Sequence, residues 1–270
     1  MPIVSAFCKK GGVGKTTFLG YLAHYYATQG KTVLVISADD QNSIFKIFGV
    51  DNFVTDKDDD FFEYLLLNDK EGKKEPKDVT FEGRINMYLM KTLNTDSLSL
   101  DLTLRRPQEK KLRGLIESFN QIFDYVFIDF PPSSSRLSEI LLDISQSILI
   151  VVGLDALGLQ GFSNTIQYFV DTDINLDKIK YIVPIGFIKG RRTPMKCLKE
   201  LKDQAKILTP NAEITAPVKD KAIIKNIQSD GLSVFDDSAI VKDKLEKFHL
   251  KNFEEIKKDL ISIYKDLKLD

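Results

Sequence analysis

The sequence predicts an α/β fold in which a mostly parallel central sheet is flanked by helices. Short apolar runs rich in β-branched residues, such as 31–37 and 147–153, are typical of strands buried on both faces of a parallel sheet. Helix-period segments alternate with these runs, as they do in strand–helix–strand units. We therefore expect a single domain over residues 1–270, with residues 236–270 as a helical extension at its C-terminus.

The first strand leads into a glycine-rich loop. An apolar run, 2–7, precedes KKGGVGKTT, 9–17, and the helix-period segment 18–29 follows and stops at Gly30. Glycines let successive backbone N–H groups turn inward and cradle an anion, and the helix points the positive end of its dipole at that anion. The strand before the loop and the helix after it favour a triphosphate site over an ordinary glycine-rich turn that contains GKT by chance.

The loop also carries side chains with predicted roles. Lys15 lies within reach of the β- and γ-phosphates, and the Thr16 hydroxyl can ligate Mg²⁺. The loop residues predicted to contact the nucleotide are Gly11, Gly12, Val13, Gly14, Lys15, Thr16 and Thr17.

Two acidic residues follow predicted strands at the edge of the sheet where the loop is expected. Asp39 comes just after the strand 31–37, where it can hold Mg²⁺ through water or orient an attacking water. Alternatively, Asp39 only caps the next turn. Asp129 ends the apolar run of 124–134, where a carboxylate can hold the water shell of Mg²⁺ opposite Thr16. Pro131 and Pro132 then constrain the exit of the chain.

Further elements are read from periodicity and composition. Apolar runs predict strands at 84–91, 180–188 and 213–218, and a helix over 108–123 carries Leu112, Leu115, Ile116 and Phe119 on one face. The polar segment 51–82 is expected to be a surface excursion with a short apolar helix at 61–67. The C-terminal segment repeats apolar residues at helical spacing, at Phe253, Ile256, Leu260, Ile263 and Leu267, which predicts a helix packed on the domain or on a partner.

Composition limits the class of protein. The formal net charge is −1, so that any affinity for nucleic acid requires a local basic patch. No apolar run is long enough to resemble a signal peptide or a membrane span, which favours a cytoplasmic protein. The two cysteines, Cys8 and Cys197, are far apart in sequence and predict neither a disulfide framework nor a zinc site.

The motifs together resemble the ParA and MinD family. The loop is similar to the deviant Walker A loop xKGGxGK[ST], with Lys9 where the common loop has glycine and Lys10 as the additional lysine. The segment after the second strand resembles the switch motif D-x-D-P-Q, although Ser37 replaces its first Asp and Asp40 replaces its Pro. The run that ends at Asp129 resembles the Walker B and switch II pattern hhhhDxPP. The resemblance covers the chain in order from residue 2 to about residue 235.

This resemblance implies an ATPase that uses ATP and Mg²⁺ and forms a homodimer with both nucleotides at the interface. Its catalytic residues would be Lys10, Lys15 and Asp39, with Lys10 reaching the phosphates of the other subunit, and its metal site would comprise Thr16, Asp39 and Asp129. Pro217 matches the proline of a loop that encloses the base in relatives. Phe187 stands where relatives offer Asn or Thr to the adenine edge, and Asp155 stands where they more often carry Glu. Adenine specificity is therefore less firmly predicted than triphosphate binding.

A basic region lies between residues 178 and 225, with twelve Lys and Arg residues against four acidic ones. In a helix that starts near Thr193, Lys196, Lys199 and Lys202 or Lys206 recur at three- and four-residue steps and form one stripe. Such a stripe suits phosphate backbones bound without sequence preference, although a solvated lysine face has the same pattern. The residues predicted to bind DNA are Lys189, Arg191, Arg192, Lys196, Lys199, Lys219 and Lys221.

The family resemblance and this stripe imply a partition ATPase. Such a protein would bind double-stranded DNA non-specifically in the ATP state, associate with the nucleoid, and hydrolyse ATP slowly until a ParB-like centromere-binding protein stimulates it. A MinD-like membrane regulator is the main alternative, but it requires a basic C-terminal helix, and after residue 253 four lysines face five acidic residues. A cluster-carrying ATPase would need paired cysteines. A small-molecule ligase such as dethiobiotin synthetase would leave the lysine stripe unexplained.

Overall fold

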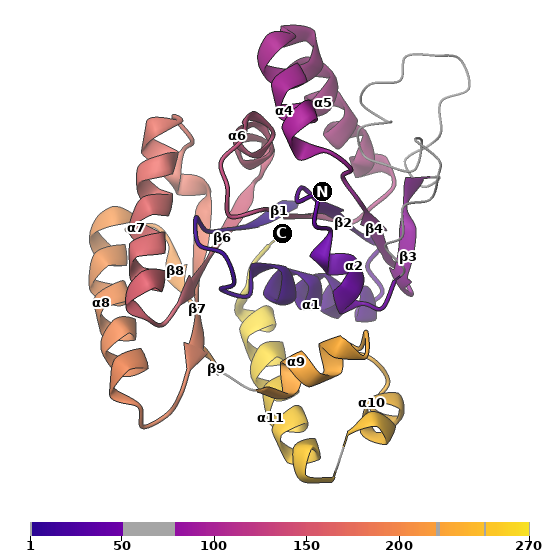
Figure 1. The fold of residues 1–270 in the computed structure, drawn as a ribbon, viewed down its shortest axis with the longest axis vertical. Coiled ribbons are helices and arrows are strands. Elements are labelled where there is room, and N and C mark those ends of the chain that lie inside the picture. Colours follow the sequence, from indigo (N-terminus) through magenta and orange to yellow (C-terminus); the bar gives the residue numbers. More distant parts are fainter. Residues whose placement is uncertain (1, 51–78, 220–221, 246, 270) are drawn as a thin grey trace.

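The computed structural model describes residues 2–50, 79–219, 222–245 and 247–269, whose strands form one mixed but mostly parallel sheet (Figure 1). The strand order is β3-β4-β2-β5-β1-β6-β7-β8, and β9 pairs with β7 beside β8. The predicted fold class is thereby confirmed. The strands are β1 Ile3–Phe7, β2 Val33–Ser37, β3 Phe81–Arg84, β4 Met87–Met90, β5 Tyr125–Asp129, β6 Ser147–Gly153, β7 Ile179–Phe187, β8 Glu213–Ile214 and β9 Val218–Lys219.

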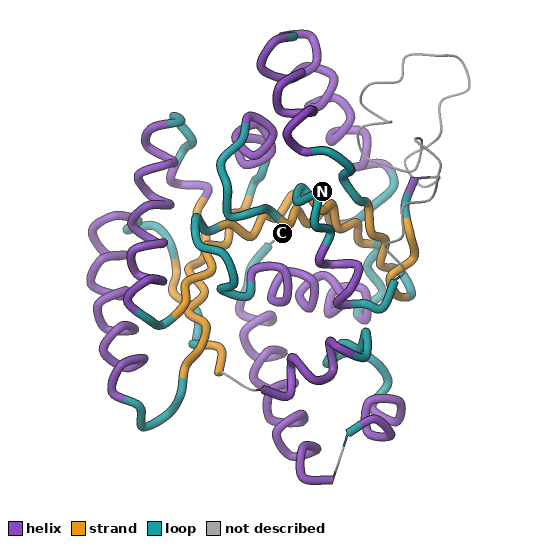
Figure 2. The backbone as a smooth tube through the Cα atoms, in the orientation of Figure 1, coloured by secondary structure: helices purple, strands orange, loops and turns teal. Residues whose placement is uncertain are grey.

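Helices cover both faces of the sheet and make a three-layer molecule (Figure 2). Helices α4 to α8 line one face, and α1, α2 and α9 to α11 line the other, because buried residues from these two groups belong to two separate cores. The helices are α1 Lys15–Thr28, α2 Ser43–Ile47, α4 Thr95–Leu104, α5 Arg106–Ser118, α6 Arg136–Ile144, α7 Ala156–Asp171, α8 Arg192–Leu208, α9 Ala222–Ser229, α10 Ser238–Lys244 and α11 Lys247–Asp266, with single 3₁₀ turns η2 Phe119–Gln121 and η3 Leu176–Lys178.

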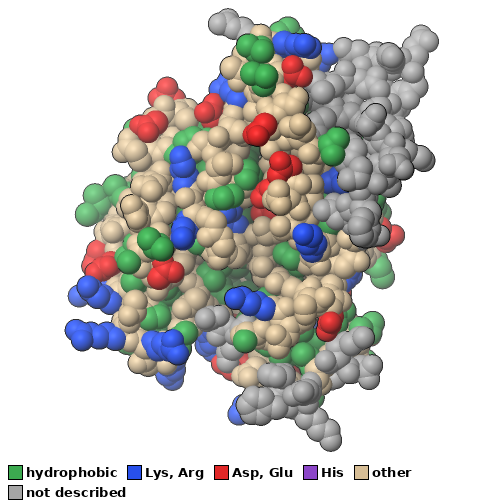
Figure 3. Space-filling model, viewed as in Figure 1, with side chains coloured by type: hydrophobic (Ala, Val, Ile, Leu, Met, Phe, Trp, Pro, Cys, Tyr) green, Lys and Arg blue, Asp and Glu red, His purple; other side chains and the backbone are tan. Residues whose placement is uncertain are grey.

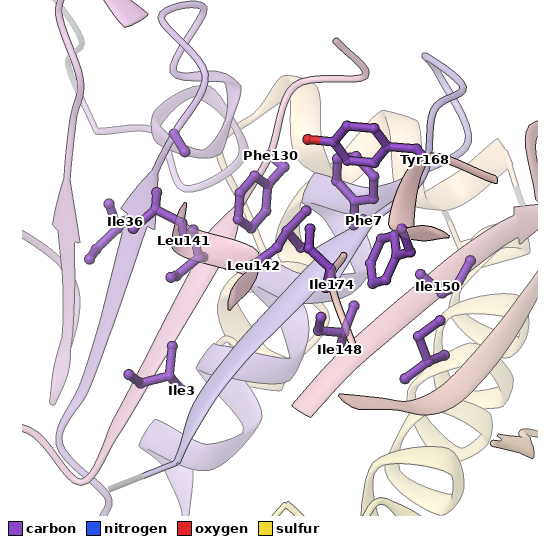
Figure 4. Packing of buried hydrophobic residues seen from close by; sticks show 14 of the residues in the cluster. Ile3, Phe7, Ile36, Phe130, Leu141, Leu142, Ile148, Ile150, Tyr168 and Ile174 are labelled. Carbon is purple, nitrogen blue, oxygen red and sulfur yellow. The ribbon is translucent and has the colours of Figure 1, made fainter. Parts of the chain in front are cut away.

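Strand β1 shows why its apolar run has no polar face. Successive side chains of a strand point to opposite sides, and here both sides are buried. Ile3 and Phe7 enter the core under α4 to α8, whereas Val4 and Ala6 enter the core under α1 and α11. At the end of the strand, the Phe7 ring packs edge-on against Phe130, with ring centroids 5.7 Å apart (Figure 4).

Two of the predicted strands differ in the structure. The predicted strand 84–91 contains all of β4 but only the last residue of β3, and these two strands pair as an antiparallel hairpin over 81–90. Asn86 adopts a left-handed conformation with φ of 62° and reverses the chain between them. Residues 213–218 form two short pieces, β8 and β9. Pro217, which lacks a backbone N–H, lies between them, and both pieces pair with the edge of β7.

Helix α11 packs on the domain, as one of the two predicted arrangements requires. Its apolar stripe is 0–4% exposed, from Phe253 to Leu267. The Tyr264 hydroxyl donates a hydrogen bond to the Phe18 carbonyl of α1 at 3.0 Å, and the two rings lie 5.1 Å apart. The apolar face of α11 is therefore covered by the rest of the molecule. A membrane-binding helix would need the same face to be exposed.

Three further expectations concern the polar segment 51–82, membrane-spanning helices and the two cysteines. The predicted helix at 61–67 and most of the polar excursion fall outside the described residues. Within the part of the chain that is described, no helix is long and apolar enough to cross a membrane. Cys8 and Cys197 are both free and buried, as small apolar side chains would be.

Candidate nucleotide site

The loop between β1 and α1 has the backbone that a phosphate cradle needs. Gly12 and Gly14 adopt positive φ angles of 72° and 91°, in the left-handed region that residues with a Cβ rarely occupy. Gly11 does not share this conformation. Gly14 precedes α1 directly, and none of the described side chains caps the first N–H groups of that helix. These N–H groups are therefore available to an anion.

Lys15 lies inside this loop with 6% of its surface exposed. Its ammonium group donates a hydrogen bond to the Lys10 carbonyl at 3.2 Å. Burial lowers the pKa of Lys15, while the nearby carboxylates of Asp129 and Asp39 raise it. A buried ammonium of this kind, whose burial is not matched by a full set of hydrogen bonds to the described residues, is suited to bind a phosphate oxygen.

Asp129 ends β5 between β1 and β2, where it is paired in register with Ala6 and Ser37. It is 1% exposed, and burial raises its pKa to about 7 against the lowering effect of a hydrogen bond with Thr16 and of the Lys15 charge. Its Oδ1 atom has no hydrogen-bond partner among the residues that the structure describes. A buried carboxylate oxygen without a partner next to a threonine hydroxyl fits a hard cation such as Mg²⁺.

The small number of protein ligands at this place also fits magnesium. Among the described residues, no group of three or more His, Cys, Asp and Glu side chains is placed to hold a metal ion. Mg²⁺ keeps several waters and is usually bound through one or two carboxylates together with substrate phosphates. Thr16 and Asp129 are a set of that kind.

Asp39 follows β2 and is half-buried. Its Oδ1 accepts a hydrogen bond from the Gln41 N–H at 3.0 Å, so that one carboxylate oxygen caps the turn. The charge of Asp39 is nevertheless felt by both Lys15 and Asp129. Ser37, which replaces the first Asp of the switch motif, is buried and donates to the Asp39 carbonyl at 2.9 Å. An Asp at that position would place a second buried carboxylate beside Asp129.

Strand β7, which carries Phe187, borders the loop. Ile185 of β7 lies 3.6 Å from the position that a Cβ on Gly14 would take, so that β7 borders the loop. Phe187, two residues on, packs against the core under α7 and α8 instead of presenting a polar edge. Pro217 is half-buried between β8 and β9. Asp155 caps α7 by accepting a hydrogen bond from the Gly158 N–H at 2.7 Å.

Two residues that contact the loop have no motif in the sequence. The Gln228 side chain of α9 donates to the Thr17 hydroxyl at 3.0 Å. The Thr165 hydroxyl of α7 accepts from the Lys9 N–H at 3.0 Å. Both contacts join positions more than 150 residues apart in the chain. Only the tertiary structure reveals such contacts.

Five of the seven residues predicted to bind DNA are exposed. Lys189, Arg191 and Arg192 are exposed at the turn between β7 and α8, and Lys196 and Lys199 are exposed on α8. Figure 3 shows Lys and Arg side chains gathered at the lower left, where this turn lies. Lys219 is committed elsewhere, because its ammonium pairs with Glu255 at 2.6 Å and Asp259 at 2.9 Å on α11. These two partners raise the pKa of Lys219. Lys221 lies outside the described residues.

Comparisons with known proteins agree with this geometry. Residues 1–179 match the family model AAA_31, described as an AAA domain. The chain is 27% identical over 245 residues to an uncharacterized protein of Methanocaldococcus jannaschii, covering 87% of this chain and 91% of that protein. It is 28% identical over 183 residues to the sporulation initiation inhibitor protein Soj of Bacillus subtilis, covering 66% and 70%.

Solved structures show the same fold. Apo McdA of Cyanothece superposes with a TM-score of 0.75 at 16% identity, covering 97% of this chain and 99% of that chain. The ATP complex of its D38A variant superposes with a TM-score of 0.72 at 19% identity, covering 97% of both chains. At such identities the likeness concerns the fold alone. The family match over more than half of the sequence, joined to the lysine-bearing phosphate loop, shows that this chain belongs to the ParA/MinD family of P-loop ATPases.

Proposed function

We propose that the chain is a partition ATPase that binds ATP and Mg²⁺, dimerises around the two nucleotides, and holds DNA non-specifically in its ATP state. A ParB-like centromere-binding partner would stimulate hydrolysis and release the DNA. The observation that carries the proposal is the position of Lys10 in a loop whose Lys15 is buried beside Asp129. The family membership supports an ATPase, and the chromosome-partitioning ATPase Soj of Treponema pallidum, 25% identical over 161 residues, supports partition.

The proposal assigns a role to the backbone of the loop and to five side chains near it. The N–H groups of residues 11–17 and the Lys15 ammonium would bind the phosphates, and Thr16 with Asp129 would hold the magnesium ion. When bound, Mg²⁺ would neutralise the charge on the phosphate oxygens. Asp39 would orient a water toward the terminal phosphate through the carboxylate oxygen that does not cap the turn. Lys10 would extend to the phosphates of the second subunit.

The DNA-binding part of the proposal depends on α8. Its buried residues, Pro194, Cys197, Leu201 and Ala205, lie on one side at helical spacing. Lys199, Lys202 and Lys206 lie on the exposed side. Three cations on one helical face suit successive phosphates of a duplex and need no contact with the bases.

The test is DNA binding in three nucleotide states and over a range of salt. Fluorescence anisotropy would measure affinity for a random duplex with a non-hydrolysable ATP analogue, with ADP and without nucleotide. Lys199→Ala/Lys202→Ala/Lys206→Ala should weaken binding in the ATP state by about 10- to 100-fold and lower the slope of log K against log salt by about 2 to 3.

A triple variant of the same charge change provides the control. Lys31, Lys110 and Lys258 are exposed and lie on other elements, so that replacing all three by Ala should leave affinity and slope within about twofold of wild type. Equal binding in all three nucleotide states would contradict the proposal. Equal losses in the two triple variants would instead show that only total charge matters.

A further inference from the structure

One face of α7 contacts the phosphate loop along residues 8–10. Gly161, Thr165 and Tyr168 recur at steps of four and three residues, so that they lie on the same side of the helix. All three are buried. The residues of the loop that they touch are Cys8, Lys9 and Lys10.

Thr165 joins this helix to the backbone of the loop. Its hydroxyl donates to the Gly161 carbonyl at 2.6 Å and accepts from the Lys9 N–H at 3.0 Å. The side chain is fully buried, with 0% exposed. A hydroxyl that is already oriented by donation to its own helix presents a fixed acceptor to the loop. This hydrogen bond therefore fixes the position of the Lys9 peptide along the axis of α7.

Gly161 sets how closely the helix approaches Lys10. A Cβ at position 161 would lie 2.8 Å from the Lys10 Cβ and 3.4 Å from the Cys8 Sγ. The first of these distances is shorter than the non-bonded contacts that carbon atoms make. The absence of a side chain at 161 therefore lets the Lys10 side chain start directly against α7.

Tyr168 contacts the first of the two neighbouring lysines. The Lys9 ammonium lies 4.8 Å from the centre of the Tyr168 ring, and that ring packs against Phe7 with centroids 5.6 Å apart (Figure 4). This cation–π contact occupies Lys9 within its own subunit. Lys10, which starts beside Gly161, is the lysine left to extend from the loop.

We propose that Thr165 is a positioning residue: its hydrogen bond to the Lys9 N–H fixes the peptide from which Lys10 extends toward a second nucleotide. The inference rests on the proposed function, because it assigns Lys10 a role between subunits. It predicts that loss of the Thr165 hydroxyl weakens ATP-dependent dimerisation much more than it weakens binding of nucleotide to one subunit.

The experiment compares two variants at this position. Thr165→Val keeps the shape but removes the acceptor, and Thr165→Ser keeps the hydroxyl. Affinity for a fluorescent ATP analogue would be measured at low protein concentration. The dimer dissociation constant would be measured by sedimentation with a non-hydrolysable ATP analogue. We expect Thr165→Val to bind nucleotide within about threefold of wild type and to dimerise about 10-fold more weakly, since an unpaired N–H disfavours the native loop. Thr165→Ser should restore dimerisation.

Thr172→Val is the matched control. Thr172 also donates its hydroxyl to a carbonyl of α7, that of Tyr168 at 2.7 Å, but it lies about two turns beyond the hydrogen bond between Thr165 and Lys9. This variant should change neither affinity. Gly161→Ala is a second variant, because it disturbs Lys10 without removing a hydrogen bond, and it should show the same split as Thr165→Val.

The outcomes separate this inference from the function on which it rests. If wild type fails to dimerise with the ATP analogue, both the proposed function and the role of Thr165 are wrong. If wild type dimerises and Thr165→Val dimerises equally well, only the role of Thr165 is wrong. An equal loss of nucleotide affinity and dimerisation that Ser does not restore would show a purely structural role. Should Thr165→Val not fold, normal dimerisation of Gly161→Ala would overturn the inference.

Discussion

At the scale of single residues, burial decides which side chains have unusual chemistry. Lys15 and Asp129 are both buried at the phosphate loop, where the shift in each pKa has burial as its largest cause. His24 of α1 is a third case, away from the site. It is buried, and its Nδ1 lies 2.9 Å from the Ser233 hydroxyl. The half-buried Asp236 lies 3.9 Å from the His24 Nε2 and accepts two hydrogen bonds from Arg84, of 2.5 and 2.8 Å.

His24 predicts a loss of stability in mild acid. Burial lowers its pKa from 6.5 to about 4, with further lowering by Arg84 and Lys257 and an opposing effect of Asp236. Above pH 6.5 the ring is neutral in both states and the native state has no penalty. As the pH falls from 6.5 toward 4, the unfolded chain binds a proton that the folded chain excludes, so that the free energy of unfolding should decrease by up to about 3 kcal/mol.

Urea unfolding at pH 7.5 and pH 5 measures this effect. His24→Gln removes the titrating group and should show a smaller decrease between the two pH values, whatever its absolute stability. Asp236, whose pKa is lowered, loses its contribution only as the pH falls below its ordinary value of 3.8, outside this window. An equal decrease in wild type and variant would contradict the assignment to His24.

At the scale of elements, α11 shows how one amphipathic pattern admits two partners. The spacing from Phe253 to Leu267 predicts a helix with one apolar face, which either a protein core or a membrane surface can cover. In the structure this face packs on α1 and on the sheet beneath it. The pairing of Lys219 with Glu255 and Asp259 attaches the same helix to β9.

Truncation of Leu260 tests this packing. Leu260 is buried in the middle of the stripe, so that Leu260→Ala should lower the free energy of unfolding by about 2–4 kcal/mol. Lys258→Ala on the exposed side of α11 should change it by less than about 0.5 kcal/mol. Denaturant unfolding gives both values. A negligible effect of Leu260→Ala, together with binding of wild type to anionic liposomes, would instead favour a membrane-facing helix.

At the scale of the whole molecule, topology assembles the site. Strands β1, β2 and β5 are parallel neighbours, so that their carboxyl ends lie at one edge of the sheet. The loop after β1, Asp39 after β2 and Asp129 at the end of β5 meet there, although they span 120 residues of sequence. In the proposed dimer, this edge of the sheet would face a second copy of the chain.

The oligomeric state is the prediction at this scale. Size-exclusion chromatography with light scattering should show a monomer without nucleotide and a dimer with ATP. Asp39→Ala should keep the dimer for longer, because hydrolysis that ends the ATP state is slowed, and Lys10→Ala should stay monomeric. Lys31→Ala, an exposed lysine away from the loop, is the control and should dimerise as wild type does. A Lys10→Ala dimer of normal lifetime would contradict the role of Lys10 between subunits.

Much of the fold could be predicted because it is local. Strand β6 has the predicted bounds, 147–153, and β1, β2 and β7 end within two residues of the predicted positions, because a strand buried on both faces is apolar throughout. The hairpin at Asn86 was not predicted. A left-handed residue after Arg84 reverses the chain near the start of the predicted run 84–91, so that only residues 87–90 of that run form β4. The same limit applies to Pro217, which divides β8 from β9.

The sequence by itself determined the fold class, the phosphate loop, and the acidic residues Asp39 and Asp129, because each depends on a short pattern of neighbouring residues. Only the tertiary structure decided that Lys219 is paired with α11, that Gln228 contacts Thr17, and that Thr165 holds the Lys9 peptide. The physical reason is that a hydrogen bond or ion pair acts over about 3 Å in space, while its two partners are separated by 36 to 211 residues of chain.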